Sequence, residues 1–118
     1  MGAVKFLLEN GADVNTKDKK NFTLLMYCAQ FGDLSLISLV LSYGAIVNIK
    51  DLSGFTALDY AIQKNNFNAV KLLIENGADI TDESYMLALE NNYKKIVEYF
   101  DSFDSNIQIL KKRAFPNE

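Results

Sequence analysis

Few side chains in this sequence could carry out covalent or metal chemistry. The 118 residues contain no histidine and a single cysteine, Cys28. Without histidine, neither a His-dependent catalytic triad nor a histidine zinc site can form, and one cysteine cannot make an internal disulfide or a Cys/His cluster. The chain also has no P-loop and no G-x-G-x-x-G phosphate loop. We therefore expect no catalytic residue, no metal and no cofactor, which predicts that the chain is not an enzyme.

Two further sites contain potentially reactive side chains, but a structural role is favoured for both. Cys28 falls among small and apolar residues, so we interpret it as a buried apolar thiol rather than a reactive nucleophile. The acidic pair Asp82–Glu83 stands in a predicted loop without an evident pocket, which favours a solvated helix cap.

The overall charge and hydropathy also exclude some partners. The formal net charge is −3 and the sequence pI is about 4.9, which disfavours a nucleic-acid surface because phosphate binding needs clustered cations. No apolar run approaches 18 residues, so the sequence predicts no membrane span. The expected partner is therefore another protein.

The elements that position the side chains follow from a repeat. Residues 3–13 read AVKFLLENGAD, and residues 69–79 read AVKLLIENGAD, 66 positions later. Residues 36–48, LISLVLSYGAIVN, form a diverged copy between them, since Gly11, Gly44 and Gly77 are spaced by 33 each time. A fixed period of about 33 residues is typical of a stacked repeat protein.

The other half of each unit repeats with the same period. Residues 18–32 read DKKNFTLLMYCAQFG, and residues 51–65 read DLSGFTALDYAIQKN. These segments resemble the ankyrin pattern D-x-x-G-x-T-P-L-H-x-A-A-x-x-G, which an I-V-x-L-L-L helix and G-A-D-V-N follow. The resemblance covers roughly residues 3–100. It implies an all-α repeat solenoid, an ankyrin-repeat stack of helix-turn-helix units joined by β-hairpin loops.

Local signals place the helices within each unit. Thr23 and Thr56 stand where a first helix should begin, because a threonine side chain can accept a hydrogen bond from an unpaired helix amide. The spacing predicts second helices over 34–43 and 68–76. Gly44 and Gly77 follow these helices, where a left-handed backbone ends the helix without steric cost for glycine.

The repeat predicts one domain over residues 1–118. Its parts are a partial repeat at 1–17, repeats at 18–50 and 51–81, a degenerate repeat at 82–100 and a C-terminal capping segment at 101–118 with a helix over 107–115. Residues 85–100 match 58–73 at an offset of 27 rather than 33. We therefore expect a short or absent hairpin before the degenerate repeat, with Asp82 or Ser84 capping the helix that follows.

The first copy contains only the second helix of a repeat. Val4, Phe6 and Leu7 should then lack part of the surface against which they would pack. Three interpretations stay open: the chain is a fragment of a longer array, it begins at an internal methionine, or the open edge meets another chain. The fragment interpretation is preferred.

The resemblance implies a binding surface made of hairpin tips and the concave face of the first helices. Carried over by position, its residues in the first full unit are Lys19, Lys20, Phe22, Gln30 and Phe31, and in the second Leu52, Ser53, Phe55, Gln63 and Lys64. Glu90 and Asn91 continue the row. Phe31 is the preferred interface residue, because Phe22 and Phe55 also have a structural interpretation as covers of the hairpin base.

One departure from the pattern affects rigidity. The histidine of T-P-L-H, which in the family helps tie neighbouring hairpins together, is Met26 in one unit and Asp59 in the next. We expect the hairpin beside Met26 to be less rigid and Asp59 to bond a backbone amide.

These observations predict a non-catalytic protein-interaction module that binds a partner on its concave face and hairpin tips. Two alternatives stay open: a partner-recruiting part of a larger effector or enzyme, and a scaffold that self-associates through the open N-terminal helix. Lysine outnumbers arginine 11 to 1, a bias typical of AT-rich genomes. Such genomes are found in many parasites, intracellular bacteria and large viruses. The lone cysteine fits a reducing compartment, so we expect a cytoplasmic location, in a host cell if the source is one of these.

Overall fold

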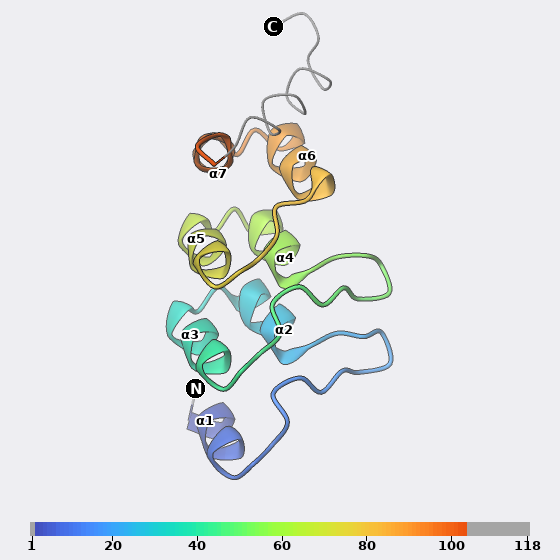
Figure 1. Ribbon diagram of the computed structural model, residues 1–118, viewed down its shortest axis with the longest axis vertical. Helices are drawn as coiled ribbons and strands as arrows, with labels where there is room; N and C mark the ends of the chain where they lie inside the picture. Colours follow the sequence, from blue (N-terminus) through green and yellow to red (C-terminus); the bar gives the residue numbers. More distant parts are fainter. Residues whose placement is uncertain (1, 104–118) are drawn as a thin grey trace, which may run out of the picture.

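A computed structural model describes residues 2–103 of the chain (Figure 1). Within this range there are seven α-helices and no strand. The helices are α1 (Gly2–Glu9), α2 (Leu24–Phe31), α3 (Leu34–Ser42), α4 (Ala57–Gln63), α5 (Phe67–Glu75), α6 (Asp82–Glu90) and α7 (Lys94–Asp101). The predicted capping helix over 107–115 lies outside the described residues.

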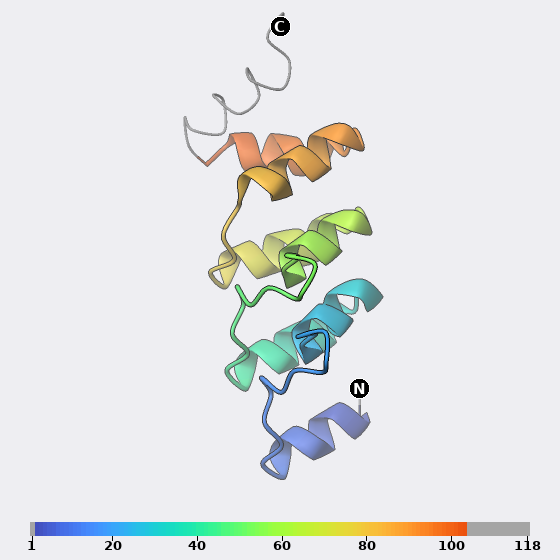
Figure 2. The same ribbon diagram turned by 90° about the vertical axis from the view of Figure 1, so that its right-hand side faces the viewer.

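The helices stack in two layers, as the all-α solenoid prediction requires. Helices α2, α4 and α6 form an inner layer, in which α4 contacts both α2 and α6. Helices α3, α5 and α7 form the outer layer, with α1 beneath α3 (Figures 1 and 2). Each of α2, α4 and α6 also packs against the helix that follows it in the chain. Because each unit contacts mainly its neighbours, the core is continuous along the stack.

Small side chains let the inner helices approach one another closely. Ala29, Ala61 and Ala88 occupy α2, α4 and α6, and all three are completely buried. The largest fully buried side chains, Tyr85 and Phe100, lie in the α6–α7 pair. The core therefore changes from small residues between units to large aromatic residues in the last described helices.

Threonines begin all three inner helices. The side chains of Thr23 and Thr56 accept hydrogen bonds from Met26 N and Asp59 N, each 3.3 Å long, which confirms the two predicted caps. The cap of α6 is Thr81, whose side chain accepts from Ser84 N at 3.1 Å, so the expectation of Asp82 or Ser84 was wrong. Thr81 has the extended backbone that an N-cap needs, whereas Asp82 and Ser84 are already within the helix.

The second helices match their predicted ranges within one residue at each end. Gly44 and Gly77 follow them with φ of 89° and 98°, the left-handed conformation expected after a helix end. Asn15 then links one helix end to the next unit, since its amide donates to Gly44 O (3.2 Å) and accepts from Ile46 N (2.8 Å). Asn48 repeats this arrangement with Gly77 and Asp79.

Two long connections project from the inner layer, and we call them the first finger (residues 10–23) and the second finger (residues 43–56) (Figure 1). The expected β-hairpins are reduced to tight turns in which Asp18 N donates to Phe22 O (3.1 Å) and Asp51 N to Phe55 O (2.9 Å). Only one isolated bridge, Lys17 with Thr23, occurs among residues 2–103.

The connection between α5 and α6 has no finger. It comprises only residues 76–81, against 43–56 for the second finger. This confirms the hairpin loss that the 27-residue offset predicted.

Candidate binding surface

Each finger is organised around one aspartate. Asp18 Oδ1 accepts hydrogen bonds from Lys20 N and Phe22 N, both 2.9 Å. Asp51 Oδ1 does the same for Ser53 N (2.9 Å) and Phe55 N (3.0 Å). These side-chain to backbone bonds close each turn, and they fix where the finger side chains project.

A tyrosine of the inner layer ties each finger aspartate to its helix. Tyr27 of α2 donates its hydroxyl to Asp18 Oδ2 at 3.2 Å, and Tyr60 of α4 donates to Asp51 Oδ2. The backbone N–H of Phe22 is the main cause that lowers the pKa of Asp18. Burial, followed by the bond to Asp51, raises the pKa of Tyr60 to about 12.

Four aromatic rings follow one another from the first inner helix to the second finger. Phe22 packs against Tyr27 and Tyr60, with ring centroids 4.5 and 5.1 Å apart, and Tyr60 packs against Phe55 at 5.7 Å. We call Phe22, Tyr27, Phe55 and Tyr60 the aromatic row. Phe22 and Phe55 thus pack against tyrosines of the inner helices, which is compatible with their structural interpretation.

Two hollows open beside the aromatic row. One, of about 490 Å³, is lined by Asp18, Lys19, Lys20, Phe22 and Tyr27. The other, of about 430 Å³, is lined by Lys20, Phe22, Asp51, Leu52, Ser53 and Tyr60. The hollows share two lining residues, Lys20 and Phe22. The fingers contact each other beside them, where Leu52 N donates to Lys20 O at 2.9 Å.

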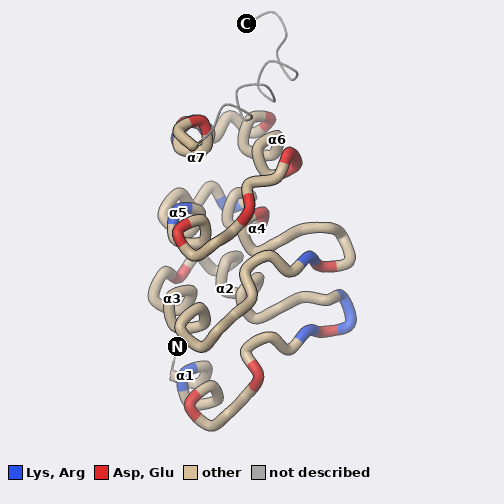
Figure 3. The backbone as a smooth tube through the Cα atoms, viewed as in Figure 1, with Lys and Arg blue, Asp and Glu red and all other residues tan. Residues whose placement is uncertain are grey.

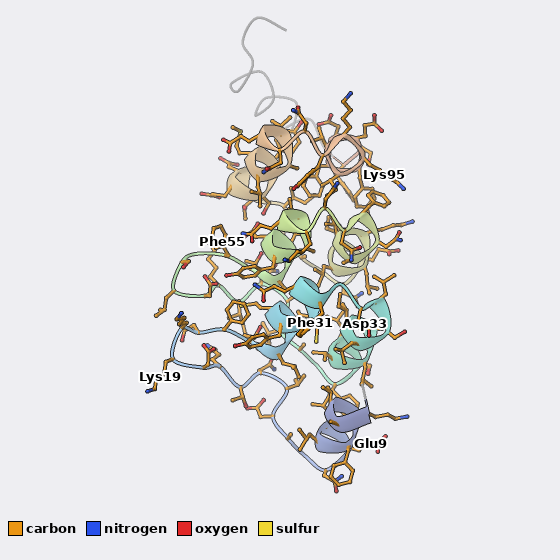
Figure 4. All side chains as sticks on the ribbon, turned by 180° about the vertical axis from the view of Figure 1, so that it is seen from behind. Glu9, Lys19, Phe31, Asp33, Phe55 and Lys95 are labelled. Carbon is orange, nitrogen blue, oxygen red and sulfur yellow. The ribbon has the colours of Figure 1, made fainter. Side chains whose placement is uncertain are left out.

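The structure divides the ten predicted binding residues into two groups. The finger group surrounds or adjoins the two hollows and comprises Lys19, Lys20, Phe22, Leu52, Ser53 and Phe55. Figure 4 shows Lys19 at the tip of the first finger. Leu52 is 70% exposed, which is unusual for a leucine and makes it the main apolar side chain at the tip of the second finger.

The second group lies where the inner helices end. Gln30 and Phe31 close α2, Gln63 closes α4 and Lys64 follows it. Phe31 is 79% exposed, the largest value among the exposed apolar side chains of residues 2–103 (Figure 4). Phe31, Lys64, Glu90 and Asn91 are all exposed at equivalent or nearby ends of α2, α4 and α6, so they form a row along the stack.

Sequence reasoning missed Tyr27 and Tyr60. Both tyrosines occupy the same position of the repeat, 33 residues apart, as do Asp18 and Asp51. This recurrence was the available signal for a paired contact. The contact between Phe22 and Tyr60 of the next unit had no such signal, because it depends on how the units stack.

The residues at the histidine position of the pattern behave differently in the two units. Asp59 Oδ2 accepts from Thr56 N at 3.0 Å, as predicted, and Asp59 Oδ1 accepts from Ser84 Oγ of the next unit at 2.5 Å. Met26 offers Thr23 N only its sulfur, at 3.5 Å. Thioether sulfur is a weak acceptor, so the first finger has the weaker anchor.

The reactive side chains of residues 2–103 are few. Cys28 is buried, as predicted, and burial raises the pKa of its thiol to about 11, so it is protonated at neutral pH. The described part of the chain contains no cluster of three or more potential metal-ligating side chains. None of its helices combines the length and apolar character that crossing a membrane would need.

Comparison with known families agrees with this architecture. A family model for ankyrin repeats (3 copies) matches residues 1–84. The chain therefore belongs to the ankyrin-repeat family. No curated protein matches it significantly. Ankyrin repeats are generally protein–protein interaction modules and are typically non-catalytic.

Proposed function

We propose that this chain is a non-catalytic module that binds a partner protein across the fingers and the exposed side of the inner helices. The observation that carries the proposal is a pair of exposed apolar side chains, Phe31 and Leu52, which do not belong to the buried core of the stack. Large apolar side chains exposed on a rigid surface often supply much of the binding energy of an interface.

The arrangement of the fingers supports the same proposal. Their backbones are held by aspartate hydrogen bonds and by the Leu52–Lys20 contact, so the surface is largely formed before binding. A preformed surface loses less conformational entropy on association, which favours affinity.

Site-specific photocrosslinking in lysate of the source cell tests this proposal. A photoreactive residue would replace Phe31, Leu52 or, as a control on the outer layer, the exposed Asn68 of α5. The proposal predicts that positions 31 and 52 capture the same protein and position 68 does not. The purified partner should then lose affinity for a Phe31→Ala, Lys64→Glu variant that retains cooperative unfolding. Capture from position 68 alone would contradict the proposal.

A second candidate is self-association through α1. Phe6 and Leu7 are 64% and 57% exposed there, at consecutive positions of one short helix. Burying these two side chains against a second copy would remove them from water at about 1.5–3 kcal/mol each. Sedimentation velocity over a range of concentrations tests this. A dimer that a Phe6→Ser, Leu7→Ser variant abolishes would support it, and a monomer throughout would reject it.

A further inference from the structure

The finger surface carries a local charge opposite to that of the whole chain. Lys17, Lys19 and Lys20 lie on the first finger and Lys50 on the second, and all four are exposed. Figure 3 shows these basic positions along the fingers. The chain as a whole has a net charge of −3.

Asp13, Asp18 and Asp51 also lie on the fingers, so four lysines against three aspartates leave a net charge of +1 there. None of the three aspartates forms an ion pair with these lysines. The carboxylate oxygens of Asp18 and Asp51 accept hydrogen bonds from backbone amides and from the hydroxyls of Tyr27 and Tyr60.

Within residues 2–103 the ion pair present is Lys5–Glu9 on α1, so none of the four finger lysines lies within ion-pair distance of a carboxylate there. The charge of Lys20 is still near enough to contribute to the lowered pKa of Asp18. The ammonium groups of the four lysines are thus available to an external anion.

Apolar surface lies directly beside these cations. Lys20 and Phe22 line both hollows, and the exposed Leu52 borders the second. A ligand that satisfied only the charges would leave the aromatic row uncovered. A ligand that fits both features has acidic side chains and at least one large apolar side chain close together.

The next unit has the opposite charge. Asp79, Asp82 and Glu83 are exposed where α6 begins, in place of a third finger (Figure 3). An acidic ligand is attracted to the fingers and repelled from this edge, which limits it to the two fingers.

From this juxtaposition we propose that the fingers bind a short acidic segment of a partner protein, with an apolar side chain seated against the aromatic row. The inference rests on the proposed function, because it assigns the partner chemistry of part of that surface. In this proposal the fingers bind the acidic segment, and the row that contains Phe31 contacts a different part of the same partner.

Fluorescence polarisation with three labelled octapeptides tests the proposal. The first alternates glutamate with leucine and phenylalanine, the second has lysine for each glutamate, and the third has serine for each apolar residue. We expect binding of the first peptide only, weakened by raising NaCl from 50 to 300 mM because exposed charges are screened.

Two charge-reversal variants provide a matched pair. Lys19→Glu, Lys20→Glu should weaken binding of the first peptide by about ten-fold or more, as expected for losing two exposed ion pairs and adding repulsion. Lys71→Glu, Lys94→Glu makes the same charge change on exposed positions of α5 and α7 and should leave affinity unchanged. Circular dichroism and thermal unfolding verify that both variants fold.

Four outcomes would overturn the proposal. They are absence of binding, equal binding by the two charge variants, equal binding of the serine peptide, and tighter binding of a dodecathymidylate oligonucleotide than of the acidic peptide. If the chain forms a dimer and only the Lys19→Glu, Lys20→Glu variant disrupts it, the fingers bind the acidic edge of a second copy instead, which would also overturn the proposal. If the peptide fails but positions 31 and 52 still crosslink one protein, the proposed function stands and only this inference falls.

Discussion

The two fingers share one design but differ in how firmly they are held. In each finger, an aspartate side chain accepts hydrogen bonds from two backbone amides and a tyrosine hydroxyl. Tyr60 lies between the rings of Phe22 and Phe55, whereas Tyr27 contacts the ring of Phe22 alone. Accordingly, Asp51 is buried and Asp18 is exposed. Position in the stack, rather than local sequence, decides how far the same hydrogen bonds are shielded from water.

The two fingers also differ in the residue that bonds the backbone N–H of the threonine cap at their base. Asp59 joins its own helix start to Ser84 of the next unit through a carboxylate, and Met26 offers one weak sulfur contact. The Asp59–Ser84 bond also links the unit that lacks a finger to the rest of the stack. A polar network thus compensates there for the missing finger contacts.

The largest expected effect comes from removing the stronger anchor. Asp59→Ala should lower the free energy of unfolding by about 3 kcal/mol, because the buried Thr56 N–H loses its acceptor and the link to Ser84 disappears. Met26→Leu, which keeps the volume, should cost less than about 1 kcal/mol. Urea unfolding of both variants measures the contrast, and equal losses would show that the two anchors are equivalent.

The turn residues give the next largest contrast. Gly54 has φ of 86° with open space around it, and the equivalent Asn21 of the first finger has φ of 60°. Gly54→Ala should destabilise the chain by about 1 kcal/mol, since alanine is strained in the left-handed region. Asn21→Gly should be neutral or slightly stabilising. Thermal unfolding measures the stability change of both variants. A Gly54→Ala variant more stable than the wild type would contradict a left-handed backbone at this turn.

The tyrosine hydroxyls should also contribute unequally to the stability of the two fingers. Tyr60→Phe removes a partly buried bond to Asp51 and should cost about 1 kcal/mol of unfolding free energy. Tyr27→Phe, whose bond to Asp18 is exposed, should cost less. A larger loss for Tyr27→Phe in urea unfolding would reverse the proposed order of the two fingers.

The last prediction is a pH dependence that Tyr60 introduces, which is confined to alkaline pH. Its pKa is about 12 in the folded chain against an ordinary value of 10, so the folded state holds this proton more tightly than the unfolded state. The stabilising contribution is complete below pH 10 and is lost as pH rises towards 12. The advantage of the wild type over Tyr60→Phe should shrink across this window in urea unfolding, and an advantage that grew with pH would contradict the assignment.

The repeat made most of the fold predictable. The 33-residue period, the threonine caps and the glycines after the second helices indicated helix positions to within a residue, because those signals are local. The cap at Thr81 was missed because the repeat is shortened there and the register of the pattern is lost. The hairpins were overpredicted, since the family pattern does not show that these turns close after one bridge.

The binding surface was predictable only in part. Position in the repeat indicated that Phe31 and Leu52 would be exposed, and they are. It did not separate the finger group from the helix-end row, and it did not reveal the aromatic row. The contact of Phe22 with Tyr60 joins different units, and the unpaired state of the finger lysines depends on what the aspartates bind. Both are properties of the stack and have no local sequence signal.

Hydrogen exchange at two equivalent amides tests the central comparison most directly. Thr23 N is bonded to the sulfur of Met26, and Thr56 N to the carboxylate of Asp59. The amides of Tyr27 and Tyr60, which donate to Thr23 O and Thr56 O, report the stability of each helix start and serve as internal controls. With the two tyrosine amides equally protected, the Thr23 amide should exchange about ten-fold faster than the Thr56 amide. Protection of Thr23 equal to or above that of Thr56 would contradict it.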